Sequence, residues 1–134
     1  MIKKIGAGYT VLIGLSMLGF WCMLLAGNRM PELATQPAYA AFHLAAEALT
    51  AASLILGGVG TLLRKRFGAK LYPVSLGMLL YSVLNAAGYF LQGADTAMGA
   101  MFIVFAVLTV LFILHYHCEK QTTELLVAKP NGLP

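Results

Sequence analysis

Residues 38–63 read AYAAFHLAAEALTAASLILGGVGTLL, and this stretch decides the fold. It is apolar over more than the ~20 residues that an α-helix needs to cross the hydrocarbon core of a bilayer. Glu47 is its only formal charge. An ionisable side chain at that depth costs at least about 2.5–3.5 kcal/mol on insertion scales, so it is rare unless it is paired or functional. The stretch therefore predicts a transmembrane helix that carries an unusual polar site.

Three further blocks of the same kind account for the composition of the chain. Of the 134 residues, 60% are hydrophobic and 10% are charged, and the mean hydropathy is +0.80. About a quarter of the residues of a typical soluble domain are charged. None of the blocks alternates in the way that the strands of a membrane barrel do. We predict an all-α membrane protein with four transmembrane helices, at about residues 5–26, 38–63, 71–91 and 96–117.

Short connections and an uneven distribution of basic residues predict the topology. Short links make sequential helices antiparallel neighbours, which gives an up-down-up-down bundle. Eight of the nine Lys and Arg residues fall on one side of that bundle, and only Arg29 falls on the other. Because basic residues mark the cytoplasmic side, we expect both termini in the cytoplasm. Residues 1–120 would form the four-helix transmembrane domain, and residues 121–134 a mobile cytoplasmic tail.

Polar side chains follow one arc of each of the two middle helices. His43 and Glu47 are one turn apart on the first, and Asn85 and Tyr89 are one turn apart on the second. At 1.5 Å per residue, Asn85 comes level with Glu47 and Tyr89 level with His43, in the outer half of the bilayer. We therefore predict a site that binds a ligand or a proton. It comprises these four residues and two further members of the second arc, Tyr81 and Gln92.

Several chemistries are open for this site. A protonated Glu47 could hydrogen-bond Asn85, or His43 and Glu47 could form an ion pair across one helical turn, and either contact could simply join helices. Helix contacts in lipid are usually made by Ser, Thr, Asn or Gln, so Glu and His favour the handling of a proton, a metal or a ligand. Cys22 lies at a depth similar to that of His43, and a Cys/His/Glu set suits zinc. His43 could equally be an axial haem ligand.

Small residues predict close contacts between helices. In lipid, where the hydrophobic effect does not drive helices together, small side chains let two backbones approach closely. Such residues also make a homo-oligomer plausible, and the strong orientation bias favours a parallel dimer. The small residues of the two middle helices are Ala41, Ala45, Ala48, Ala52, Gly57, Gly58, Gly60, Ala86, Ala87 and Gly88.

The segment AAEALTAASLILGGVGTLLRKRFGAKLYPVSLGML, together with the size and layout of the chain, resembles the DoxX-like small four-helix membrane proteins. The shared features are an acidic residue early in the second helix, here Glu47, then a Gly-rich Leu/Ile sequence, a basic turn and an apolar third helix. The resemblance implies a respiratory or oxidative-stress context, near quinone, in the cytoplasmic membrane of a bacterium or an archaeon.

We therefore expect a small membrane protein that binds a small molecule or an ion at the predicted site, and that transports it with proton coupling in the sharpest form of this hypothesis. The alternatives are an accessory or assembly subunit of a membrane complex, for example a respiratory one, and a redox protein that holds metal or haem. The sequence has no Ser/His/Asp set, phosphate-binding glycine loop or CxxC pair, so we expect binding rather than catalysis. A nucleic-acid partner would need a basic folded face; the expected partners are lipid and a second copy of the chain.

Overall fold

The computed structural model of the chain describes residues 2–27, 32–93 and 96–128, and this part of the protein is all-helical. Four of its helices are long and apolar enough to cross a membrane, and α2 is a single turn. The number and type of the long helices confirm the prediction. In chain order, the elements are α1 (Ile2–Ala26), α2 (Glu32–Thr35), α3 (Pro37–Leu62), α4 (Arg66–Gln92) and α5 (Thr96–Ala128).

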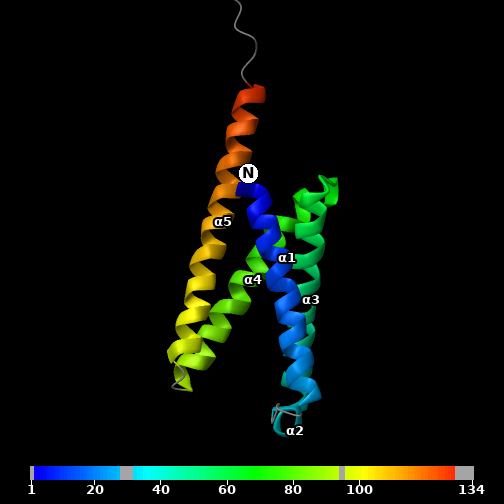
Figure 1. Ribbon diagram of the computed structural model, residues 1–134, viewed down its shortest axis with the longest axis vertical. Helices are drawn as coiled ribbons and strands as arrows, with labels where there is room; N and C mark the ends of the chain where they lie inside the picture. Colours follow the sequence, from blue (N-terminus) through cyan, green and yellow to red (C-terminus); the bar gives the residue numbers. More distant parts are fainter. Residues whose placement is uncertain (1, 28–31, 94–95, 129–134) are drawn as a thin grey trace, which may run out of the picture.

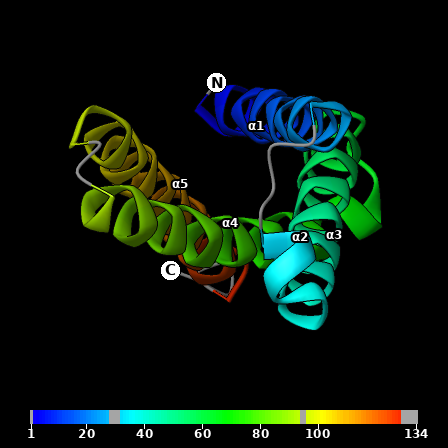
Figure 2. The same cartoon turned by 90° about the horizontal axis from the view of Figure 1, so that it is seen from below.

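The long helices run alternately up and down, and each packs on the next one in the chain (Figure 1). Thus α1 packs on α3, α3 on α4, and α4 on α5, whereas α1 and α5 contact each other little. Those two helices meet near the beginning of α1 and diverge towards the other end (Figure 1). Seen from that end, α1, α3, α4 and α5 follow one another around an open arc (Figure 2). The bundle is therefore closed at one end only.

The close contacts of α1 with α3 and of α3 with α4 depend on glycines. Gly14 of α1 lies against the backbone of Ala51, so that a Cβ added at Gly14 would come within 2.9 Å of the Ala51 carbonyl oxygen. Gly58 of α3 is pressed against α1 in the same way, since a Cβ added there would come within 2.7 Å of the Ala7 carbonyl oxygen. Gly57 and Gly60 are buried towards α4. The prediction that the glycine run of α3 marks close helix contacts is confirmed.

The turn between α3 and α4 is tighter than predicted, because α4 begins at Arg66 rather than near residue 71. The amide of Lys65 bonds the carbonyl of Gly60 (2.8 Å), and the amide of Arg64 bonds that of Thr61 (3.1 Å). These two bonds form a Schellman cap, which requires a left-handed residue just beyond the helix. Arg64 takes that conformation with φ of 54°. The helix can reverse direction here because the cap satisfies its last carbonyls.

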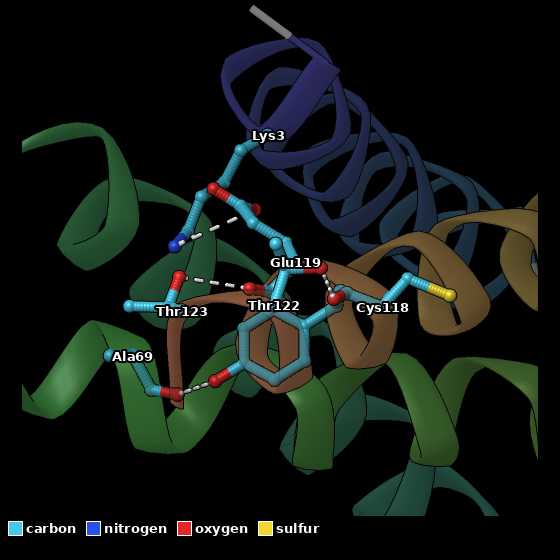
Figure 3. A network of polar contacts seen from close by, with 7 residues as sticks. Lys3, Ala69, Cys118, Glu119, Thr122 and Thr123 are labelled. Carbon is cyan, nitrogen blue, oxygen red and sulfur yellow. Dashed lines mark hydrogen bonds and ion pairs between the residues drawn. The ribbon is translucent and has the colours of Figure 1, made fainter. Parts of the chain in front are cut away.

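The end of the bundle that contains this turn, here called the basic end, is joined across three helices (Figure 3). Lys3 of α1 forms an ion pair with Glu119 of α5 (3.9 Å) and lies 5.8 Å from the centre of the Tyr116 ring. The hydroxyl of Tyr116 donates a hydrogen bond to the carbonyl of Ala69 in α4 (2.6 Å). These contacts connect α1, α5 and α4 at the end where α1 and α5 approach each other.

Helix α5 is longer than predicted. The sequence predicts the end of this helix at residue 117 and a mobile tail at residues 121–134. In the structure, α5 continues to Ala128. No Pro or Gly interrupts the chain between His117 and that residue. An ion pair between Lys120 and Glu124 (3.7 Å) also supports the added turns at the favourable i,i+4 spacing. Residues 121–128 of the predicted tail therefore belong to α5.

The apolar core forms two clusters in the middle and towards the basic end of the bundle. The larger one is built on Leu54 of α3, Leu79 and Val83 of α4 and Ala106 of α5, with Tyr9 of α1 packed against it. The smaller one joins α1 to α4 and contains Ala7, Tyr72 and Leu76. Both clusters depend on α4, which is the only helix in the described part of the chain with fully buried members in both.

Tyr9 makes the main polar contact between α1 and α5. Its hydroxyl lies 3.2 Å from the Thr109 hydroxyl and 3.4 Å from the Phe105 carbonyl oxygen. We expect Tyr9→Phe to lower the free energy of unfolding by about 0.5–1 kcal/mol, because one interhelical bond is lost while Thr109 keeps its own bond to Phe105. Unfolding in mixed micelles with increasing SDS measures this loss. The matched control is Tyr39→Phe, since Tyr39 is exposed; an equal loss in both variants would contradict the assigned contact.

Candidate functional site

Glu47 lies in α3, half-buried, and contacts the neighbouring helix through its carboxylate. The hydroxyl of Ser82 in α4 donates towards both carboxylate oxygens, at 2.8 Å from Oε1 and 2.9 Å from Oε2. Ser82 itself is buried. In the part of the chain that the structure describes, no Lys, Arg or His side chain lies within ion-pair distance of Glu47. The carboxylate is therefore held by one hydroxyl and is not neutralised by a basic side chain.

His43 lies one turn from Glu47 and is surrounded by aromatic rings. The edge of its imidazole meets the Trp21 ring of α1, with centres 5.5 Å apart and planes at 76°. On its own helix it is stacked on Tyr39, with centres 6.1 Å apart and planes at 4°. The predicted ion pair between His43 and Glu47 is not formed among the described residues. The ring contacts turn the imidazole towards α1 and Tyr39, whereas the carboxylate extends towards α4.

The predicted polar arc of α4 faces outward. Asn85 is exposed and donates its amide hydrogen to the Tyr81 carbonyl of its own helix (3.0 Å). The rings of Tyr81 and Tyr89 and the side chain of Gln92 are exposed as well. The predicted contact between Glu47 and Asn85 is therefore not formed. Depth along a helix does not determine which face turns inward, and α4 buries the face that carries Ser82.

Sequence reasoning missed Ser82, although the sequence contains a signal that could have found it. The buried face of α4 repeats at helical spacing through Tyr72, Ser75, Leu79 and Ser82. This face is rich in apolar and small residues, so the two serines are its natural partners for a polar group on α3. Ser75 bonds the carbonyl of Tyr72 within its own helix (2.8 Å), which leaves Ser82 as the serine that bonds Glu47.

The three residues considered as metal ligands do not come together as a ligand set. Among the residues that the structure describes, no group of three His, Cys, Asp or Glu side chains is placed to hold one ion. Cys22 is an exposed free thiol on α1, and the carboxylate of Glu47 is occupied by Ser82. The contact that α1 makes with His43 comes from Trp21 instead.

A shallow groove of about 460 Å³ runs along the outside of the bundle between α3 and α4. Glu47 does not line it. Its only hydroxyl groups belong to Tyr81 and to Thr50, whose hydroxyl already bonds the Ala46 carbonyl (2.8 Å). The groove is thus mainly apolar. Its lining residues are Ala46, Leu49, Thr50, Val74, Gly77, Met78 and Tyr81.

The arrangement around Glu47 suits the exchange of a proton or a cation. An ionised carboxylate accepts several hydrogen bonds, and here the chain supplies one hydroxyl. When the carboxyl group is protonated, the same Ser82 hydroxyl can accept the new O–H, so the contact survives in both states. A proton or a bound cation can therefore neutralise the carboxylate of Glu47.

Comparison with known proteins gives one family. No curated protein and no solved structure matches the chain. The resemblance to DoxX-like proteins therefore stays a prediction. A family model described as "Domain of unknown function (DUF8058)" matches residues 1–126, which include all four long helices except the last two residues of α5. The chain belongs to this DUF8058 family.

Proposed function

We propose that this protein is a multi-pass membrane protein that binds a proton or a small cationic ligand at Glu47. Its four long helices are of sufficient length and hydropathy to span a bilayer. The beginning of α1 and the turn between α3 and α4, which hold most of the basic residues, lie at the same end of the bundle. By the positive-inside rule, this basic end faces the cytoplasm of a prokaryotic cell, and both termini lie there.

The observation that carries the proposal is the contact of Glu47 with Ser82. Of the five acidic residues in the sequence, only Glu47 falls in the interior of an apolar helix. A charged carboxylate is costly in hydrocarbon, and a single hydroxyl bond offsets only part of that cost. Glu47 therefore gains stability whenever a proton or a cation neutralises it, which is the thermodynamic basis for exchange between the two.

The rings around His43 support a cationic ligand. Trp21 and Tyr39 contact His43, which precedes Glu47 by one turn of α3. Aromatic faces attract cations, and the Glu47 carboxylate, one turn along α3 from His43 and on the side of α4, can provide the counter-ion. A small organic cation fits this combination better than an anion or a neutral polar molecule. Competition between such a cation and a proton for one carboxylate would couple binding on the outer side to proton release.

Protonation of Glu47 can be tested with dicyclohexylcarbodiimide, which modifies protonated carboxyl groups in apolar surroundings. We expect mass spectrometry of the protein in liposomes to locate the adduct on Glu47, with labelling that falls as the pH rises. Glu47→Gln should abolish the adduct. Glu119 and Glu124 are exposed at the basic end and serve as internal controls, because water-exposed carboxylates should stay unlabelled.

Cation binding is tested by adding tetraphenylphosphonium before the carbodiimide. We expect this probe to slow the labelling of Glu47 in the wild type, and to bind less tightly at low pH because protons compete for the carboxylate. Trp21→Ala should weaken that protection while leaving the labelling itself intact. Labelling that does not depend on pH, or direct binding of tetraphenylphosphonium that is as tight in Glu47→Gln as in the wild type, would contradict the proposal.

A further inference from the structure

The surface formed by α3 and α4 on the outside of the bundle carries polar and small residues that the single chain does not use. On α4 they follow one stripe, here called the α4 stripe, of Gly77, Tyr81, Asn85 and Gly88. The side chain of Tyr81 is 71% exposed. A Cβ added at Gly77 or Gly88 would meet no atom within 4 Å, so neither glycine is required by packing inside the chain. This contrasts with Gly57, Gly58 and Gly60 of α3, each of which is pressed against a neighbouring helix.

Asn85 is the polar centre of the α4 stripe. Its amide nitrogen donates to the Tyr81 carbonyl. Within the described part of the chain, the carbonyl oxygen of its amide accepts no hydrogen bond, and one N–H remains free. In the membrane orientation proposed above, this amide would face hydrocarbon, where an unsatisfied polar group is unfavourable. A partner that supplies both a donor and an acceptor at this depth would satisfy it.

A second copy of the same chain meets that requirement directly. Two copies inserted with the same orientation place their Asn85 residues at the same depth. An amide is self-complementary, because its N–H donates and its carbonyl accepts across a two-fold axis. The α4 stripe contains no charged residue, so two stripes do not repel each other. A different protein would need a matching amide or hydroxyl at the same level, which a second copy provides by symmetry.

The surroundings of Asn85 also fit a close helix contact. Gly77 and Gly88 lie on either side of Asn85 and are about 16 Å apart along the helix. Glycines at such positions let two backbones approach in lipid, which shortens the distance across which the amides must pair. The groove between α3 and α4 lies beside the stripe and shares Gly77 and Tyr81 with it. It offers an apolar depression of about 460 Å³ for side chains of the second copy.

We propose that the α4 stripe is the interface of a parallel homodimer, in which the two Asn85 amides pair across the two-fold axis. The inference rests on membrane insertion with a fixed orientation and not on ligand binding at Glu47. If Glu47→Gln bound the cation as tightly as the wild type, the proposed function would fail, but the dimer interface would not be affected. Conversely, a monomeric protein could still bind a cation at Glu47, so the two proposals fail separately.

Cysteine cross-linking in native membranes tests the location of the interface. The two natural cysteines are exposed and are first replaced, as Cys22→Ser and Cys118→Ser. In that background we expect Gly88→Cys to form a disulfide-linked dimer rapidly on oxidation. Met101→Cys is the control, because Met101 is exposed on α5 at a similar distance from the same end of the bundle. Equal cross-linking from both positions, or a Gly88→Cys adduct with a different protein only, would overturn the proposal.

Energy transfer between labelled copies in liposomes, measured as the protein is diluted with lipid, tests the role of Asn85. We expect Asn85→Leu to weaken dimerisation roughly tenfold. Asn85→Gln should retain part of the affinity, because it keeps the amide. Leu84→Ala, next to Asn85 and exposed, is the control for a general effect of substitution. Circular dichroism verifies that each variant is helical. A wild type that stays monomeric at every dilution, or Asn85→Leu that dimerises as well as the wild type, would refute the interface.

Discussion

Replacing Gly68 with alanine is expected to lower the free energy of unfolding by about 3 kcal/mol. Gly68 lies in the first turn of α4, where the chain returns along α3. A Cβ at this position would collide with the backbone carbonyl carbon of Gly60 and with the backbone nitrogen of Thr61. Backbone atoms cannot rotate away as a flexible side chain can, so the helices must separate. That movement would disturb the Schellman cap at Arg64 and Lys65 as well.

The effect is measured as the shift of the SDS-induced unfolding transition, followed by circular dichroism and by the fluorescence of Trp21, the only tryptophan in the sequence. Gly8→Ala is the matched control. Gly8 also lies within a helix, but a Cβ there would meet no atom within 4 Å, so we expect a change within about 0.5 kcal/mol. Similar stabilities of the Gly68→Ala and Gly8→Ala variants would show that α3 and α4 do not approach as closely as described.

The second large effect is expected at Glu47. We predict that Glu47→Leu raises the free energy of unfolding by about 2 kcal/mol while it abolishes carbodiimide labelling and cation binding. Leucine removes the cost of placing a carboxyl group in hydrocarbon. The lost bond to Ser82 is a smaller term, because that hydroxyl can turn to a carbonyl of its own helix. A gain in stability together with a loss of binding is the result expected for a residue that serves function and lowers stability.

The opposite result would assign Glu47 a purely structural role. If Glu47 only joins α3 to α4, then Glu47→Leu and Ser82→Ala should each lower stability. The double variant should then be no worse than either single one, because both remove the same contact. Measured together, these three variants distinguish a functional carboxylate from a structural one. Glu47→Gln completes the set, since its amide retains a hydrogen bond to Ser82 while it cannot be ionised.

The overall fold could be predicted because it depends on the length of apolar runs. A run of more than ~20 apolar residues has few alternatives to a long helix, and four such runs are visible directly in the chain. The end of α5 could not be placed in this way. The chain becomes polar from Glu119 to Glu124, and hydropathy does not show that the helix continues through such a segment. The tight α3–α4 turn was also hidden, because a left-handed Arg64 at the cap is not the residue type expected there.

The sequence pointed to one residue of the Glu47–Ser82 contact and not to the other. Glu47 is conspicuous because any acidic residue in such a run is unusual, and its half-buried position on α3 agrees with that emphasis. Its expected partner was Asn85, which lies less than one turn from Ser82, but only Ser82 is buried against α3 while Asn85 is exposed. Similarly, i,i+4 spacing allowed a pair between His43 and Glu47, whereas the aromatic contacts of Trp21 and Tyr39 decide where the imidazole lies.

By itself, the sequence determined that the protein consists of four long apolar helices, that neighbouring helices run antiparallel, and that a single carboxyl group lies within their apolar runs. These properties follow from hydropathy, chain length and loop length, which are local and additive along the chain. Only the tertiary structure decided that Ser82 holds Glu47, that α1 and α5 meet at one end alone, and that Asn85 is left on the outer surface. Those properties depend on the rotation of each helix about its own axis, which is determined by the packing of all its neighbours at once.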